Sequence, residues 1–204
     1  MIRLLSTCIT FLLIGAFDVQ AQHQHQSSVH SQYAGQENQP LKSLTTEDIK
    51  GLRSGAGTPF NGMAKPAELN GYPGPRHVLD AFQAGEFDLS EYQLEAIEDL
   101  FEEMQQKAIP LGEKIIELET AIDNGFKNKS ITPDELKKLT HESGKTYADL
   151  RYTHLITHLQ MLEILTKDQV QHYNELRGYT NEDPCINIPE GHDPEMWKKH
   201  NGCN

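Results

Sequence analysis

The chain has 204 residues, a formal net charge of −12, and only 37% hydrophobic and 7% aromatic residues. This composition predicts one small domain with a thin apolar core, such as a helical hairpin or a small bundle. The negative charge argues against nucleic-acid binding, because a phosphate backbone recruits basic patches. An acidic surface suits metal cations or basic proteins, although it is also ordinary for a soluble protein.

Residues 1–21 have the pattern of a secretory signal peptide. Arg3 gives a short positive start, residues 4–17 are mostly apolar, and Val19 and Ala21 occupy the −3 and −1 positions of a cleavage site. The apolar run is shorter than the roughly 20 residues that a membrane-spanning helix needs. We therefore expect export, cleavage near Ala21 and no membrane span in the mature chain.

Residues 22–75 are predicted to be a disordered or irregular segment, and residues 22–40 lack apolar periodicity. Within this segment, Leu44–Ile49 is a candidate start of a short helix, capped by Thr45 or Thr46. His23, His25 and His30 lie among glutamines and serines. A flexible arm of this kind captures transition metals weakly, and a plain low-complexity linker is the alternative. The many glycines and prolines after Ser54 exclude long regular elements up to residue 75.

Residues 76–179 are predicted to form a helical hairpin domain. Ser90 is a good N-cap residue, and Gln93 completes a capping box with it. From Leu94 to Ile122 apolar residues recur at alternating spacings of three and four, which is typical of paired helices. Pro110 lies inside this repeat and is expected to kink the helix without ending it.

A second long helix begins at Thr132, which is followed by Pro133 at the first helical position and by Glu135 at the capping-box position. Its apolar pattern continues to Leu165. Because neither helix can bury its apolar stripe alone, the two are expected to lie antiparallel. The predicted fold class is therefore all-α, a long antiparallel hairpin with short flanking helices. One of these starts at Thr166, and a further short helix is a candidate at 193–197 in the tail.

The tail, residues 180–204, contains both cysteines that remain after signal cleavage, Cys185 and Cys203. In an oxidising compartment a bond between them closes a loop of about 19 residues and contributes about 3 kcal/mol by loop entropy. The spacing fits neither a redox motif nor a zinc finger. A local disulfide is the favoured interpretation.

His154 and His158 are one helical turn apart, a spacing that lets two imidazoles share one metal ion. A turn centred near residue 128 places His158 level with Glu98, which we expect as the carboxylate partner. Two histidines and a carboxylate suit zinc, whereas the nearby Met161 favours copper. The alternative is that both histidines pack at the edge of the leucine stripe and bind nothing.

Two Leu-Ser/Thr-x-x-Gln motifs, Leu89–Gln93 and Leu165–Gln169, accompany the hairpin and the signal peptide. In this combination the chain resembles the Spy/CpxP-like periplasmic proteins and the related heavy-metal sensor and resistance proteins. The resemblance covers about residues 89–179. It implies a periplasmic helical hairpin that forms a cradle-shaped homodimer and responds to metal or to envelope stress.

Two functions follow as expectations. The first is metal binding in heavy-metal resistance or sensing, through His154, His158, Glu98 and Met161, with zinc or copper. The second is an ATP-independent chaperone or envelope-stress regulator that binds an unfolded protein or a stress sensor. The metal sensors also carry a histidine pair on an early helix, and the helix from Ser90 has none. No nucleophile elbow, HExxH or phosphate-binding loop is present, so an enzyme is not expected.

Overall fold

The computed structural model describes residues 31, 33–57, 63–179, 185–186, 188 and 191–203. The chain divides into two units, 1–37 and 38–204. In the first unit, the described residues form tight turns, in which the amide of Ala34 donates to the carbonyl of Ser31 at 3.0 Å. The predicted signal peptide and the three histidines of the arm lie outside the described residues.

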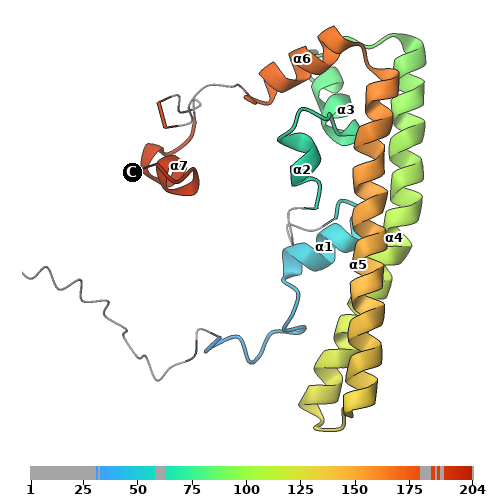
Figure 1. Ribbon diagram of the computed structural model, residues 1–204, viewed down its shortest axis with the longest axis vertical. Helices are drawn as coiled ribbons and strands as arrows, with labels where there is room; N and C mark the ends of the chain where they lie inside the picture. The colour runs from blue at the N-terminus through green and yellow to red at the C-terminus, as the bar shows by residue number, and fades with distance from the viewer. Residues whose placement is uncertain are drawn as a thin grey trace, which may run out of the picture. The chain divides into compact units, whose positions relative to one another are not determined.

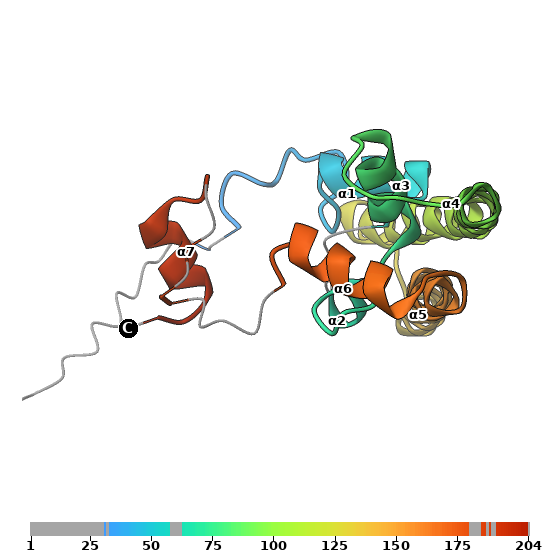
Figure 2. The same cartoon turned by 90° about the horizontal axis from the view of Figure 1, so that it is seen from above.

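The second unit contains a long helix pair and several short helices. Their bounds are α1 (Thr46–Ser54), α2 (Lys65–Glu68), α3 (Pro75–Gln83), α4 (Glu91–Lys127), α5 (Pro133–Ile164), α6 (Lys167–Leu176) and α7 (Pro194–His200). No strand occurs in the described part of the chain, so the all-α prediction is confirmed. Helices α4 and α5 run antiparallel along their lengths, and α1, α2, α3 and α6 gather on one side of this pair (Figures 1 and 2).

The two long helices begin at the residues that the sequence predicts. The hydroxyl of Ser90 accepts from the amide of Gln93, and the Gln93 side chain accepts from the amide of Ser90. Thr132 and Glu135 make the same reciprocal pair at the start of α5. Helix α4 continues through Pro110, whose ring is exposed, so the missing amide does not interrupt the buried face.

The apolar core consists of two clusters along the hairpin. One lies under α3 and α6 and contains Val78, Leu79, Phe87, Ile97, Leu100, Met161, Leu165 and Tyr173. The other lies under α1 and contains Leu41, Leu44, Leu52, Met63, Ala108, Ile115 and Leu150.

The short helix that the sequence predicts to start at Leu44–Ile49 is confirmed as α1, with Thr45 as its N-cap. The rest of the described stretch from 38 to 75 is more ordered than predicted. It contains α2, and Leu41, Leu44, Leu52 and Met63 belong to the second cluster. They are buried because the hairpin offers an apolar face that they can cover.

The buried face of α5 differs from the predicted leucine stripe in its second half. Leu159 and Leu162 are 52% and 40% exposed, whereas His154 and His158 are only 7% and 4% exposed. The side that the short helices cover therefore carries the histidines, and the leucines face away from it.

The two Leu-Ser/Thr-x-x-Gln motifs contact each other directly. The side-chain nitrogen Nε2 of Gln93 donates to the Gln169 side-chain oxygen at 2.8 Å and to the carbonyl of Ile164 at 3.0 Å. Gln169 in turn donates to the Gln93 side-chain oxygen at 3.2 Å and to the carbonyl of Asp88 at 2.9 Å. Each glutamine thus caps its own helix and binds the backbone immediately before the other motif.

Helix α1 approaches α4 so closely that its backbone touches the backbone of α4. A Cβ atom at Gly112 would lie 2.3 Å from the carbonyl oxygen of Leu52, a distance that no side chain can occupy. Beside this contact, the side chain of Gln105 donates to the carbonyl of Ser54 at 3.1 Å. Glycine at this position therefore lets the second core cluster close.

Cys185 and Cys203 form a disulfide, with Cα atoms 5.5 Å apart. The predicted pairing in the tail is therefore confirmed. Within the described residues, no helix is both long and apolar enough to cross a membrane.

We predict that Gln93→Ala and Gln169→Ala each lower the free energy of unfolding by about 1–3 kcal/mol, because each leaves part-buried polar partners unpaired. The double variant should lose about 0.5–3 kcal/mol less unfolding free energy than the two single variants lose together, because both changes remove the same hydrogen bonds between the side chains. Urea unfolding of the four proteins measures this coupling. Gln171→Ala, which removes an exposed bond to Glu175, is the matched control and should change little. Strictly additive losses would contradict the reciprocal contact.

We further predict opposite effects for two glycine-to-alanine substitutions in the long helices. Gly112→Ala should destabilise the protein by about 1–3 kcal/mol, because its methyl group meets the Leu52 carbonyl. Gly144→Ala, in α5 with no neighbour within 4 Å of the new Cβ, should stabilise by about 0.5–1 kcal/mol through helix propensity. Thermal unfolding compares the two variants with the original protein. A Gly112→Ala variant as stable as the original protein would argue against the close α1–α4 contact.

Candidate functional site

A cavity of about 370 Å³ lies between the long helices and the short helices that cover them. Its lining includes His154 and His158 from α5, Glu68 from α2, His77 from α3 and Met104 from α4. Imidazole, carboxylate and thioether groups are the side-chain donors that bind transition metals. The cavity therefore gathers metal-binding chemistry from four helices.

The two histidines of α5 are fixed by backbone carbonyls. Nδ1 of His154 lies 3.0 Å from the carbonyl oxygen of Leu150, and Nδ1 of His158 lies 2.9 Å from that of Tyr72. With the proton on Nδ1, the ring of His158 donates to its carbonyl and keeps a lone pair on Nε2. Nε2 of His154 lies 3.3 Å from the carbonyl oxygen of Gly55, so both ring nitrogens of His154 face carbonyl oxygens.

Glu68 is a carboxylate that is only 8% exposed. It accepts hydrogen bonds from the hydroxyl of Tyr173, at 2.8 and 3.0 Å, and from that of Tyr179 at 3.1 Å. Nε of Arg177 lies 3.9 Å from the carboxylate, and Nε2 of His77 lies 3.7 Å from it. These partners satisfy a buried charge that would otherwise be costly.

Burial and charge shift the acid–base properties around Glu68. Burial, together with the positive charge of Arg177, lowers the pKa of His77 below its usual range. Burial, together with the negative charge of Glu68, raises the pKa of Tyr173 well above its usual range. At neutral pH His77 is therefore a neutral imidazole with a lone pair, and Tyr173 keeps the proton that it donates to Glu68.

Glu98 and Met161 lie apart from the cavity. The contacts of Ser143 with Glu119 and of Thr157 with Met104 place the middle of the hairpin near residue 131 rather than 128. His158 is thus level with about Met104, and Glu98 lies roughly 9 Å further along α4. Glu98 is exposed, and Met161 is fully buried in the apolar cluster with Ile97 and Leu100. Neither lines the cavity.

Two residues that the sequence did not single out as ligands, Glu68 and His77, lie beside the predicted histidines instead. Glu68 belongs to a four-residue helix among glycines and prolines, where no periodicity marks a residue as buried. In their present positions, no three His, Cys, Asp or Glu side chains in the described part of the chain are close enough to hold a metal ion. The donors share a cavity but have not closed around a common point.

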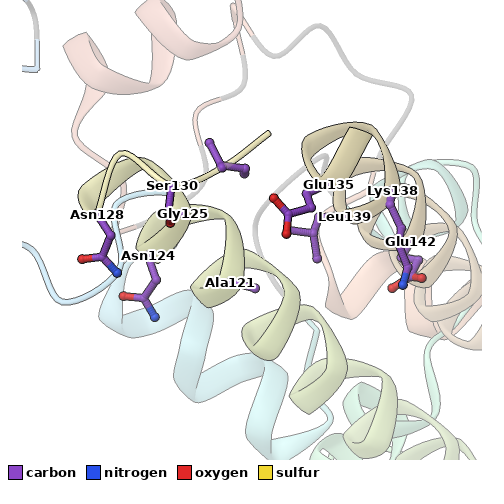
Figure 3. Close-up of a pocket in the computed structure, with 10 residues that line it drawn as sticks. Ala121, Asn124, Gly125, Asn128, Ser130, Glu135, Lys138, Leu139 and Glu142 are labelled. Carbon is purple, nitrogen blue, oxygen red and sulfur yellow. The ribbon is translucent and has the colours of Figure 1, made fainter. Parts of the chain in front are cut away.

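A second hollow, of about 480 Å³, lies at the turn of the hairpin (Figure 3). Its lining includes Asn124 from α4, Asn128 at the C-cap of that helix, and Glu135, Lys138 and Glu142 from α5. Its described lining contains no His, Cys or Met, and the carboxylate of Glu135 is already hydrogen-bonded to Thr132. The donors suited to transition metals are found in the other cavity.

Comparison of the chain with family models, with curated proteins and with solved structures gives no match in any of the three.

Proposed function

We propose that the protein is an exported, periplasmic metal-binding protein of the Spy/CpxP-like type that acts in heavy-metal resistance or sensing. The ion would bind in the cavity at His154 and His158. One observation carries the proposal: both buried histidines place Nδ1 against a backbone carbonyl. This is the outer hydrogen bond that commonly orients a metal-ligating histidine.

The donor set of the cavity supports zinc or copper as the ion. Neutral imidazoles and the carboxylate of Glu68 suit zinc, and the thioether of Met104 favours copper. The disulfide between Cys185 and Cys203 supports export, because such bonds persist in oxidising compartments. No catalytic residue is part of the proposal.

We expect the purified protein, expressed without a histidine tag, to bind zinc or copper. The His154→Ala/His158→Ala double variant should bind at least about tenfold more weakly, since each imidazole contributes a donor. Isothermal titration calorimetry measures both affinities. His141→Ala is the matched control, because His141 is exposed on the same helix, and it should leave the affinity unchanged. If the double variant binds with the same affinity as the original protein, the ion does not bind at His154 and His158.

The exposed apolar residues of α5 favour a second candidate function, an ATP-independent chaperone or envelope-stress regulator. Tyr152, Leu159 and Leu162 are 66%, 52% and 40% exposed on this helix. Apolar side chains left in water on one long helix offer a surface to an unfolded protein or a stress-sensor protein. The homodimer that the resemblance implies is a further way to cover them.

If the second function holds, the protein should suppress aggregation of an unfolding client without metal or nucleotide. Leu159→Ser/Leu162→Ser should abolish most of this suppression and leave stability nearly unchanged, because both side chains are exposed. Light scattering of a heated client follows the effect. Ile186→Ser, an exposed apolar residue outside the hairpin, is the control. No suppression by the original protein at an equimolar ratio would count against this candidate.

A further inference from the structure

The two oxygens of Glu68 face different groups of partners. Oε2 accepts from the hydroxyls of Tyr173 and Tyr179 and lies 3.9 Å from Nε of Arg177. Oε1 also accepts from Tyr173, at 3.0 Å, and lies 3.7 Å from Nε2 of His77. The carboxylate is therefore held by tyrosine hydroxyls at both oxygens, and Oε1 is the oxygen that faces His77.

The separation of Glu68 and His77 is close to the separation of two ligands on one ion. Zinc bonds of about 2.0–2.2 Å in tetrahedral geometry place neighbouring donor atoms about 3.4 Å apart. The distance of 3.7 Å between Nε2 and Oε1 exceeds this by a few tenths of an ångström. The side chain of His77 is 43% exposed, so it has room to move inward.

His158 and the same carboxylate oxygen both border Gly74. A Cβ atom at Gly74 would lie 3.0 Å from Oε1 of Glu68 and 2.9 and 3.5 Å from Cε1 and Nε2 of His158. Glycine at this position therefore keeps a space open beside both the imidazole and the carboxylate. The backbone of Gly74 is extended and accepts an L-residue without strain. Alanine at this position would therefore fill the space without disturbing the backbone.

We propose that Oε1 of Glu68, Nε2 of His77 and Nε2 of His158, which do not meet at one point in their present positions, come together as the ligands of a divalent ion of the zinc class when His77 moves inward. Two imidazoles and one carboxylate are a common zinc set and leave a fourth position for water. This inference rests on the proposed metal-binding function and keeps His158 of its site. It replaces Glu98 by Glu68 as the carboxylate, and it replaces His154, whose Nε2 lies 3.3 Å from the Gly55 carbonyl oxygen, by His77.

Zinc titration of the original protein and four variants tests the ligand set. His77→Ala and Glu68→Gln should each weaken zinc binding about 10- to 100-fold, because each removes a donor or its charge. Gly74→Ala should weaken binding while keeping every donor atom, because its methyl group fills the space beside two of the ligands. Glu98→Gln, a change of the same kind at an exposed carboxylate of α4, should leave the affinity unchanged.

The outcomes separate this inference from the proposed function. If the original protein binds zinc and the His154→Ala/His158→Ala variant does not, the function stands. Unchanged affinity in His77→Ala, Glu68→Gln and Gly74→Ala would then overturn the ligand set alone. No zinc binding by the original protein would overturn both. Circular dichroism establishes that each variant is folded, and His77→Ala and Gly74→Ala decide the result if Glu68→Gln does not fold.

Discussion

The reciprocal amide contact of Gln93 and Gln169 is the constraint on which the arrangement of the short helices depends. Each glutamine caps its own helix and donates to the backbone just before the other motif, at Ile164 or at Asp88. The starts of α4 and α6 are consequently held together at the open end of the hairpin. Because the amides are part-buried, a sliding of either helix would leave several polar groups without partners. This fixes the direction in which α6 leaves α5.

The direction of α6 in turn determines where a buried charge can be satisfied. Helix α6 and the residues after it bring Tyr173, Arg177 and Tyr179 to Glu68, which belongs to a short helix about a hundred residues earlier in the chain. Without these donors a carboxylate at this depth would be strongly unfavourable. The same carboxylate borders the cavity that contains His77 and His158. Glu68 therefore contributes both to the packing of α6 against α2 and to the lining of the cavity.

Much of the fold could be predicted from local sequence, whereas the composition of the site could not. The capping boxes at Ser90 and Thr132 act over three residues, so the starts of both long helices follow from the sequence directly. The register of the hairpin depends on how the turn closes, and a shift of its centre from residue 128 to about 131 is enough to separate Glu98 from His158. The leucines of α5 were misleading for a related reason: Leu159 and Leu162 fit an apolar stripe, but the covered side of the helix is the one with the histidines.

The sequence by itself determined the helices, their caps, the antiparallel pairing of the two long ones and the disulfide of the tail, because these depend on spacing, short-range hydrogen bonds and residue type. Only the tertiary structure decided which side of α5 is covered and which carboxylate meets its histidines. Those outcomes depend on α1, α2 and α3 packing over the hairpin. The stretch from Ser54 to Pro75, between α1 and α3, is rich in glycine and proline and shows no apolar period. Glycines such as Gly74 and Gly112 act by leaving space for groups that are distant in the chain.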